Sequence, residues 1–324
     1  MTYSSIEQLR AELLRVVTSA AEPRDGCALL DFPDFANPGD SLVWLGAVAF
    51  LKQEYAISPS YVAARREYCP QRLRLHCPSG PIYLNGGGNF GERDEGVQTF
   101  FEIILSDFPD RRVVQLPVSI DLLNTGAEQA LREAIQRHGN SVILARDIPS
   151  LKTVEKLGCE AHLCPDMAFA LGQQTRPTNA KLDAVLLLRA DRKRDDSVEY
   201  HGPTQIIDWH EDDFFMRLAG RILHPIRLTL SQIPALHRMY AVMLTWIASR
   251  RALRGKRMLA SARRVITDRL HAHILALMMG IPNIAVDGPG GKIARFLDAW
   301  TGDIPSVGIA PDLRTALGCS TKPR

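Results

Sequence analysis

The residues with the clearest chemical potential lie between positions 265 and 277, in the segment VITDRLHAHILAL. A short apolar run leads there into a helical pattern, and Asp268 is a candidate N-cap for that helix. If Asp268 caps the helix, Arg269 and His271 fall in its first turn, where free amides and the positive end of the helix dipole attract anions. The segment therefore predicts a site in which a guanidinium, an imidazole and backbone donors meet one anion.

His271 and His273 are the two histidines of this segment. Residues two positions apart point about 200° from each other around a helix, so the pair cannot share one metal ion and no metal site is expected. We expect one of the two to face the site and the other to pack. A core or surface role is the ordinary alternative for a single helical histidine.

Two further cations follow apolar runs at the starts of expected helices. Arg146 comes after residues 142–145, where a guanidinium suits bidentate capture of a carboxylate or phosphate. An ion pair with Asp147, or one between domains, is the alternative. Lys292 follows the glycine-rich turn at 287–291, where its charge and the loop amides could bind phosphate. A solvated lysine is the alternative there.

Backbone amides are expected to contribute at two loops. The segment Asn37-Pro38-Gly39-Asp40 can cap a helix and turn its amides toward a ligand, or it is simply a well-capped helix start. Three consecutive glycines at 86–88 cost conformational entropy unless the backbone passes close to a ligand or a neighbouring loop. Their spacing fits neither the dinucleotide nor the Walker motif. The candidate substrate-binding residues are Asn37, Asp40, Gly87, Gly88, Asn89 and Lys292.

These junctions lie where short runs of Val, Ile and Leu give way to helical patterns, which is typical of a parallel sheet covered by helices. In the first half we expect strands at 27–32, 81–84, 113–116, 142–145 and 161–164, and helices at 41–53, 95–107, 127–138 and 150–157. In the second half we expect strands at 184–188, 205–207, 264–266 and 283–286, and helices at 236–250, 269–279 and 292–300.

The pattern restarts after a polar stretch at 172–181, which predicts two α/β domains. We place an N-terminal Rossmann-like domain at residues 1–175 and a C-terminal one, which carries the RLH motif (Arg269-Leu270-His271), at 176–324. Two such domains would face each other across a cleft. Ligands bind beyond the carboxyl ends of the strands in folds of this class.

Composition excludes several classes of protein. Of 324 residues, 46% are hydrophobic and 23% charged, as in ordinary globular chains. A net charge of +3 does not indicate nucleic-acid binding. Six scattered cysteines without a CxxC motif favour packing roles in a reducing compartment. Because the N-terminal residues do not resemble a secretory signal and no apolar run could span a bilayer, we expect a cytoplasmic protein.

Local charge is less even than the total. Seven cations gather between positions 250 and 264: Arg250, Arg251, Arg254, Lys256, Arg257, Arg263 and Arg264. One solvated face is the ordinary interpretation, and contact with anionic membrane lipid or a lipid-diphosphate carrier is the other. The acidic run Asp208, Glu211, Asp212 and Asp213 is expected to form a surface loop.

Taken together, five segments resemble the bacterial polysaccharide pyruvyl transferase family in order and spacing, from about residue 30 to residue 300. They are NPGD, the triple glycine, ARD at 145–147, TDRLHAHILALMMGIPNIAVD and the following GGK. The resemblance implies two Rossmann-like domains arranged as in GT-B glycosyltransferases. It also implies a phosphoenolpyruvate donor, no cofactor, and a sugar acceptor that gains a pyruvate ketal. One departure is Pro117-Val118-Ser119-Ile120, where relatives often carry a P-Q-S-type segment.

By position, the resemblance implies donor-binding and catalytic roles for Arg146, Arg269 and His271. Phosphoenolpyruvate carries a carboxylate and a phosphate, which the two arginines and helix-start amides could hold. His271 could protonate the vinyl carbon or deprotonate the attacking hydroxyl, and both steps stay open. We expect a glycan acceptor, lipid-linked, and peripheral contact with the inner membrane.

Two alternatives compete with this hypothesis. A GT-B-type glycosyltransferase would use the same cleft and glycine loops to hold a nucleotide sugar. A sugar-phosphate or anionic-lipid binding module would instead use the basic cluster at 250–264.

Overall fold

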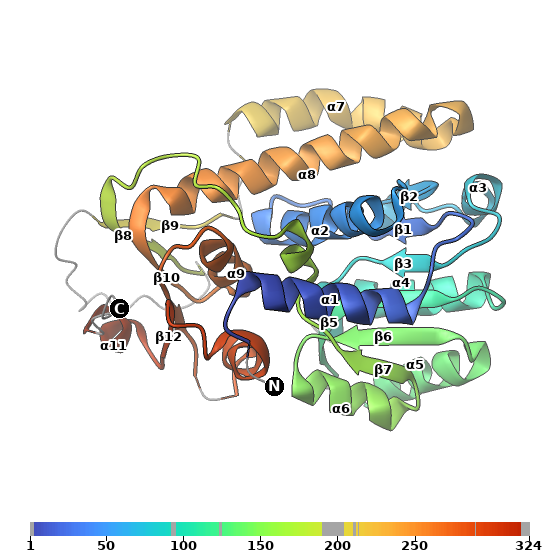
Figure 1. Cartoon of the computed structure of the whole chain (residues 1–324). Coiled ribbons are helices and arrows are strands. Elements are labelled where there is room, and N and C mark those ends of the chain that lie inside the picture. The colour runs from blue at the N-terminus through green and yellow to red at the C-terminus, as the bar shows by residue number, and fades with distance from the viewer. Residues whose placement is uncertain are drawn as a thin grey trace.

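The computed structural model describes residues 3–91, 95–122, 125–189, 204–209, 212, 214–288 and 290–318. Two parallel β-sheets lie beside each other, with helices on both faces of each (Figure 1). The mixed α/β class is therefore confirmed. Within the described residues, no helix is both long and apolar enough to cross a membrane.

The first sheet has seven strands in the order β2-β1-β3-β5-β6-β7, with β4 paired to β5. All of its pairings are parallel. The strands are β1 (Ala28–Leu30), β2 (Tyr61–Ala63), β3 (Ile82–Leu84), β4 (Gly87–Gly91), β5 (Val113–Asp121), β6 (Ser141–Ala145) and β7 (Glu160–Leu163).

Successive strand residues point to opposite faces, so Ala28 and Leu30 join one buried apolar cluster and Leu29 joins another. Helices α1 and α2 supply the side of Leu29, and α4, α5 and α6 supply the other side. The helices of this half are α1 (Ile6–Ala20), α2 (Pro38–Tyr55), α3 (Pro70–His76), α4 (Glu95–Asp107), α5 (Thr125–His138) and α6 (Ile148–Leu157).

The second sheet has five parallel strands in the order β12-β11-β10-β8-β9. They are β8 (Leu182–Leu187), β9 (Thr204–Ile207), β10 (Ala262–Thr267), β11 (Asn283–Val286) and β12 (Val307–Ala310). The helices that follow residue 176 are α7 (Phe214–Gln232), α8 (His237–Ala260), α9 (Leu270–Met278), α10 (Lys292–Phe296) and α11 (Leu313–Gly318). One buried apolar cluster includes side chains of both sheets and of α2, α8 and α9.

Once β4 is set aside, the second sheet has the doubly wound order 2-1-3-4-5, and the first has the same order with a sixth strand at its end, 2-1-3-4-5-6. The chain winds outward from β1 to β2 and then returns to β3, and it repeats this with β8, β9 and β10. Between the first and third strands of such a sheet, loops diverge at the carboxyl edge and leave a crevice. The fold therefore predicts ligand sites beyond β1 and β3 and beyond β8 and β10.

Every strand expected from the sequence is present, and α4 has the expected bounds. The structure adds α1, β2, α3, α7, β12 and α11, which are not among the elements expected from the sequence. It also corrects the glycine segment, because Gly87–Gly91 is a strand rather than a loop. Gly87 and Gly91 have φ values of 149° and 116°, which residues with a side chain rarely adopt.

Candidate functional site

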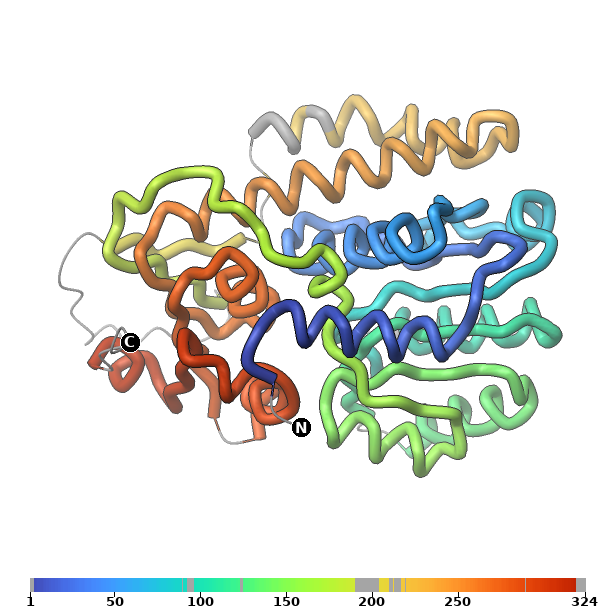
Figure 2. Tube along the Cα trace, in the orientation of Figure 1, coloured from blue at the N-terminus to red at the C-terminus, as the bar shows by residue number. Residues whose placement is uncertain are grey.

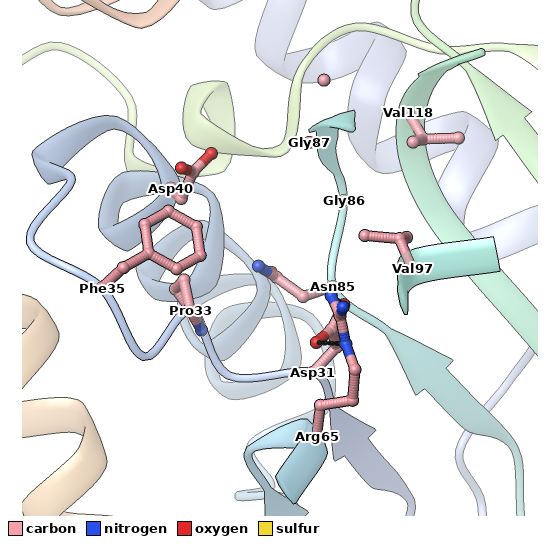
Figure 3. Close-up of a pocket in the computed structure, with 11 residues that line it drawn as sticks. Asp31, Pro33, Phe35, Asp40, Arg65, Asn85, Gly86, Gly87, Val97 and Val118 are labelled. Atoms are coloured by element: carbon pink, nitrogen blue, oxygen red, sulfur yellow. Dashed lines mark hydrogen bonds and ion pairs between the residues drawn. The ribbon is translucent and has the colours of Figure 1, made fainter. Parts of the chain in front are cut away.

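A pocket opens at the first predicted crevice (Figure 3). Asp31 follows β1 and Asn85 follows β3, so the pocket lies where the strand order reverses. Asp40 and Phe35 lie on one side of it, and Val97 and Val118 lie on the other. The lining residues are Asp31, Pro33, Phe35, Asp40, Arg65, Asn85, Gly86, Gly87, Gly88, Val97 and Val118.

Polar and aromatic groups are combined in this pocket. Asp31 has a left-handed backbone (φ 64°) and pairs with Arg65 at 3.1 Å. The Oδ1 atom of Asn85 is buried and has no hydrogen-bond partner among the described residues. The ring of Phe35 is 46% exposed. An apolar ring beside a few fixed polar groups is typical of small-molecule sites.

Arg146, Asp166 and His271 meet beside the pocket. Arg146 follows β6 and is 1% exposed, and its Nη1 donates to Asp166 Oδ2 at 2.5 Å. The Nε2 atom of His271 lies 3.4 Å from that Nη1 and 3.4 Å from the same carboxylate oxygen. The structure therefore brings together two of the three predicted catalytic side chains, although 125 residues separate them.

Sequence reasoning missed Asp166, which follows β7 and is fully buried. Burial alone would raise the pKa of this carboxyl group, but His271 and Arg146 outweigh burial and hold its pKa well below the usual range. The backbone N–H of Ala168 also donates to it, at 2.9 Å. An aspartate three residues after the end of a strand was the available sequence signal, similar to the one that pointed to Arg146.

Asp147 does not pair with Arg146, which was the alternative left open by the sequence. Asp147 is the N-cap of α6 and accepts from the backbone N–H of Ser150 at 2.9 Å. Its other oxygen accepts from Ser119 Oγ at 2.7 Å, and Ser119 in turn accepts from Arg146 at 3.3 and 3.4 Å. Ser119 belongs to the 117–120 segment, which differs from the P-Q-S-type segment of relatives. It thus helps to hold Arg146 in place.

The N-terminal loop meets the RLH segment. Asn37 caps α2 through the backbone N–H of Gly39, and its Nδ2 donates to Asp40 at 2.6 Å. Asp40 Oδ1 lies 3.8 Å from His271 Nδ1. A Cβ atom at Gly39 would lie 2.5 Å from His271 Cβ, so glycine is needed for this approach. Asn37 and Asp40 are therefore part of the surroundings of His271.

The glycine strand and Lys292 also meet. Lys292 Nζ donates to the carbonyl of Gly88 at 2.6 Å and pairs with Asp121 at 2.7 Å. Burial would raise the pKa of Asp121, but the cations Lys292 and Arg295 lower it. A Cβ atom at Gly88 would lie 3.1 Å from Arg146 Nη2. Gly87 lines the pocket, and Asn89 lies in the backbone of β4.

Glycine fits both explanations considered for the triple-glycine segment. At Gly86 a Cβ atom would lie 2.3 Å from the carbonyl oxygen of Pro117, so this glycine permits close packing of backbone on a neighbouring strand. All three glycines line the pocket, and Gly86 also permits the close backbone packing. Both explanations therefore apply at Gly86.

Arg269 is held by a different carboxylate from the one that Arg146 and His271 share. Its Nη2 donates to both oxygens of Asp208, which follows β9, at 2.9 and 3.0 Å. Burial lowers the pKa of this guanidinium, and the charge of Asp208 opposes the effect. Asp208 and Asp212 of the acidic run lie in a loop as expected, but both carboxylates are paired, Asp208 with Arg269 and Asp212 with Arg251 at 3.2 Å. Glu211 and Asp213 lie outside the described residues.

The start of α9 differs by one residue from the sequence expectation. Arg269 is the N-cap residue, so Asp268 does not cap the helix. The Asp268 carboxylate instead accepts from the backbone N–H of Arg189 at the end of β8, at 2.9 Å. This hydrogen bond spans the second crevice, between β8 and β10, and takes the place of a local helix cap. His271 still lies in the first turn of α9.

The two histidines of α9 divide as expected. His273 is fully buried and contacts Asn283 at 2.6 Å and Thr301 at 2.9 Å, and burial lowers its pKa to about 4. It is a core residue, whereas His271 faces the site. Across the part of the chain that the structure describes, no three His, Cys, Asp or Glu side chains are grouped so as to hold a metal ion.

The cations at 250–264 do not form one face. Arg251 donates to the carbonyl of Pro33 at 3.2 Å, and Arg254 donates to the carbonyl of Ala36 at 2.9 Å. Lys256 donates to Gln174. The interpretation of this cluster as a single solvated or lipid-facing surface is therefore wrong, because three of its members fasten α8 to loops of the first half and the connecting segment.

Comparisons with known proteins agree with one another. The family model described as polysaccharide pyruvyl transferase matches residues 37–288. The EpsO protein of Bacillus subtilis (strain 168), assigned by name to the pyruvyl transferases, is 26% identical over 314 residues, which cover 94% of this chain and 92% of that protein. Pyruvyl transferase 1 of Schizosaccharomyces pombe is 29% identical over 289 residues, with 84% and 69% covered. A functionally uncharacterised Klebsiella pneumoniae protein shares the fold, with TM-score 0.61, 14% identity and 94% and 99% covered.

Proposed function

Because the chain belongs to the polysaccharide pyruvyl transferase family, we propose that it transfers a pyruvyl group from phosphoenolpyruvate to a sugar of an exopolysaccharide or cell-surface glycan precursor, forming a ketal. The observation that carries the proposal is the meeting of Arg146 and His271 beside a pocket at the carboxyl edge of the first sheet. A cation and a proton carrier beside a polar pocket suit a small anionic donor.

In this proposal the chain forms two Rossmann-like domains, 1–175 and 176–324, in a GT-B-like arrangement with the substrates between them. Contacts between the carboxyl edges of the two sheets support it. Arg146 reaches His271, and Gly88 accepts from Lys292. The indole N–H of Trp300 donates to the carbonyl of Arg146 at 2.7 Å. A donor bound at this junction would contact residues of both halves.

The cationic side chains that would act on the donor differ in how exposed they are. Arg146 is buried and paired, so it acts at short range through the site that it shares with Asp166 and His271. Lys292 is 29% exposed and Arg269 is 11% exposed. We assign the donor phosphate and carboxylate to these two cations, together with the first-turn amides of α9 and the backbone of Gly87 and Gly88.

His271 would carry the proton. A sugar hydroxyl adds to C2 of phosphoenolpyruvate while C3 gains a proton and becomes a methyl group, and a second hydroxyl then displaces phosphate and closes the ketal. One imidazole nitrogen is turned to Asp166, and the other lies 3.8 Å from Asp40, which lines the pocket. Asp40 therefore faces both the imidazole and the space for an acceptor hydroxyl, and it would orient that hydroxyl for deprotonation.

The test is incubation of the purified chain with phosphoenolpyruvate and a panel of synthetic and lipid-linked glycosides. We expect phosphate release and an acceptor mass gain equal to pyruvate less water, both dependent on the glycoside. Calorimetry with phosphoenolpyruvate and with common nucleotide sugars is the companion measurement. Binding of a nucleotide sugar without binding of phosphoenolpyruvate would favour a GT-B-type glycosyltransferase instead. We place the reaction in the cytoplasm, at the inner face of the membrane that carries the acceptor.

A further inference from the structure

Helices α7 and α8 form an antiparallel hairpin on the outside of the molecule (Figure 2). Helix α8 packs on α2, and α7 packs on α8, so α7 is the outer layer. The hairpin carries eight of the thirteen large apolar side chains that are exposed in the described part of the chain. They are Leu218, Ile222, Ile226, Leu228, Ile233, Met239, Val242 and Trp246.

The spacing of these side chains places them on outward faces of the two helices. Leu218, Ile222 and Ile226 are four residues apart, which gives one stripe along α7. On α8, Val242 and Trp246 are also four apart and are 65% and 44% exposed. In an antiparallel pair, positions equally far from the turn lie at the same level, so the exposed residues of α7 and α8 occupy the same stretch of the hairpin.

The charge of the hairpin has one sign. Residues 214–260 contain nine Lys and Arg residues and neither Asp nor Glu. Arg227 faces inward and pairs with Asp34 and Glu67, and Arg251 and Arg254 also bind groups of the first half. Arg221, Arg238, Arg250 and Arg257 of the hairpin are exposed.

We infer that this hairpin docks on an anionic lipid bilayer, lying in the plane of the headgroups with its apolar side chains below them. Exposed apolar side chains ringed by arginines, without acids, are the signature of a helix that lies in a membrane interface. Trp246 suits this boundary because its ring is apolar and its N–H is polar. A protein surface that contacts only solvent would not carry eight large apolar side chains on two neighbouring helices.

The inner face of the hairpin ties this surface to the pocket. Arg227 binds Asp34, Arg251 binds the carbonyl of Pro33, and Arg254 binds that of Ala36. The same loop contributes Pro33 and the exposed ring of Phe35 to the pocket lining. The hairpin that carries the docking surface therefore packs directly on the loop that lines the pocket. Resting on the proposed function, this geometry selects an acceptor sugar that is carried on a lipid.

The docking is tested by flotation of the full chain with vesicles of phosphatidylcholine, with and without a third of phosphatidylglycerol. We expect flotation with the anionic vesicles and much less with the neutral ones. Replacing Ile222, Val242 and Trp246 together by Ser should lower the partition coefficient by at least about tenfold, because each removes apolar area from the interface. The matched control replaces Leu75 and Ile103, which are equally exposed elsewhere, and should float like the parent.

The charge contribution is tested separately. Arg221→Gln and Arg238→Gln should each weaken flotation by about fivefold, the effect of one basic residue near an anionic surface. Arg263→Gln, with a side chain 77% exposed outside the hairpin, should change little. Flotation of the hairpin variants at the parent level would overturn the inference. So would a dimer in solution that the triple Ser variant converts to monomer, because a second copy would then cover this face.

Vesicle binding needs neither donor nor acceptor, so it separates this inference from the proposed function. If the chain floats but never releases phosphate from phosphoenolpyruvate, the docking stands and the proposed function fails. If turnover on a soluble glycoside is normal and the chain does not float, the proposed function stands and the docking fails. The triple Ser variant should keep its turnover on the soluble glycoside and lose at least about tenfold on a vesicle-borne one.

Discussion

His271 Nε2 lies 3.4 Å from Asp166 Oδ2. This contact joins the first turn of α9, which follows β10 of the second sheet, to the loop after β7 of the first sheet. The carboxylate is fully buried and also holds Arg146. A buried, ionised carboxylate between a guanidinium and an imidazole fixes the position of both. The orientation of the proposed proton carrier therefore depends on a residue that lies 105 positions earlier in the chain.

Replacing His271 by Gln should lower turnover by about two to four powers of ten, which is the range that general acid–base catalysis spans. Initial rates of phosphate release from phosphoenolpyruvate measure this. His162→Gln is the matched control, since His162 is 45% exposed and contacts Glu160 on the edge strand. Equal rates for parent and His271→Gln would remove His271 from the mechanism.

Asp166→Asn should destabilise the fold as well as the site. Removing one partner of a buried ion pair leaves the other charge uncompensated, and we expect the free energy of unfolding to fall by about 3 to 5 kcal/mol. Urea titration measures the loss, with the half-exposed Asp183→Asn as control. The double variant with Arg146→Met should lose less than the sum of the single variants. Additive losses would show that the two side chains act independently.

Gly39→Ala should damage activity without weakening α2. Alanine is favoured over glycine inside a helix by about 0.5 to 1 kcal/mol, but here its Cβ would lie 2.6 Å from His271 Nδ1. The imidazole would have to shift to relieve this overlap, and such a misplacement of a catalytic group can cost roughly a hundredfold in rate. In the control Gly220→Ala, the added Cβ meets nothing within 4 Å. Turnover and thermal unfolding should separate the two variants, and an active Gly39→Ala would mean that the imidazole position is not critical.

Arg269→Ala should weaken donor binding more than turnover. Loss of hydrogen bonds from a charged group corresponds to a rise in the Michaelis constant for phosphoenolpyruvate of roughly tenfold to a hundredfold. Asp208→Asn should raise it less, because the guanidinium remains while its anchor is weakened. Steady-state kinetics at varied phosphoenolpyruvate concentration measure this Michaelis constant for each variant. An unchanged Michaelis constant in Arg269→Ala would show that this arginine serves only the Asp208 pair.

Stability should fall in mild acid. Burial lowers the pKa of His237 and of His273 from 6.5 to about 4, so in the unfolded chain both bind protons at a higher pH than in the folded chain. Their contribution is complete above pH 6.5 and is lost progressively as the pH falls toward 4. Denaturant midpoints at pH 7.5, 6, 5 and 4.5 measure this. His273→Gln should have a shallower dependence on pH, and an unaltered slope would contradict the assignment.

Local sequence was sufficient for most elements of the first half. Runs of Val, Ile and Leu marked β5 and β6, and α4 lies where its helical pattern placed it. These signals depend on side chains only a few positions apart, so they survive without knowledge of the fold. The glycine strand β4 was missed because glycine has low strand propensity, and it is a strand because β5 extends beside it.

The sequence by itself determined the α/β class, the family resemblance and the candidate residues at strand ends, because each depends on short-range pattern. Only the tertiary structure decided that Asp166 completes the Arg146–His271 centre, that Arg269 pairs with Asp208, and that Arg251, Arg254 and Lys256 of α8 turn inward. Those outcomes depend on which loops two sheets bring to a common edge. Contacts between residues more than a hundred positions apart are set by packing of both sheets on shared helices, and no spacing in the chain encodes them directly.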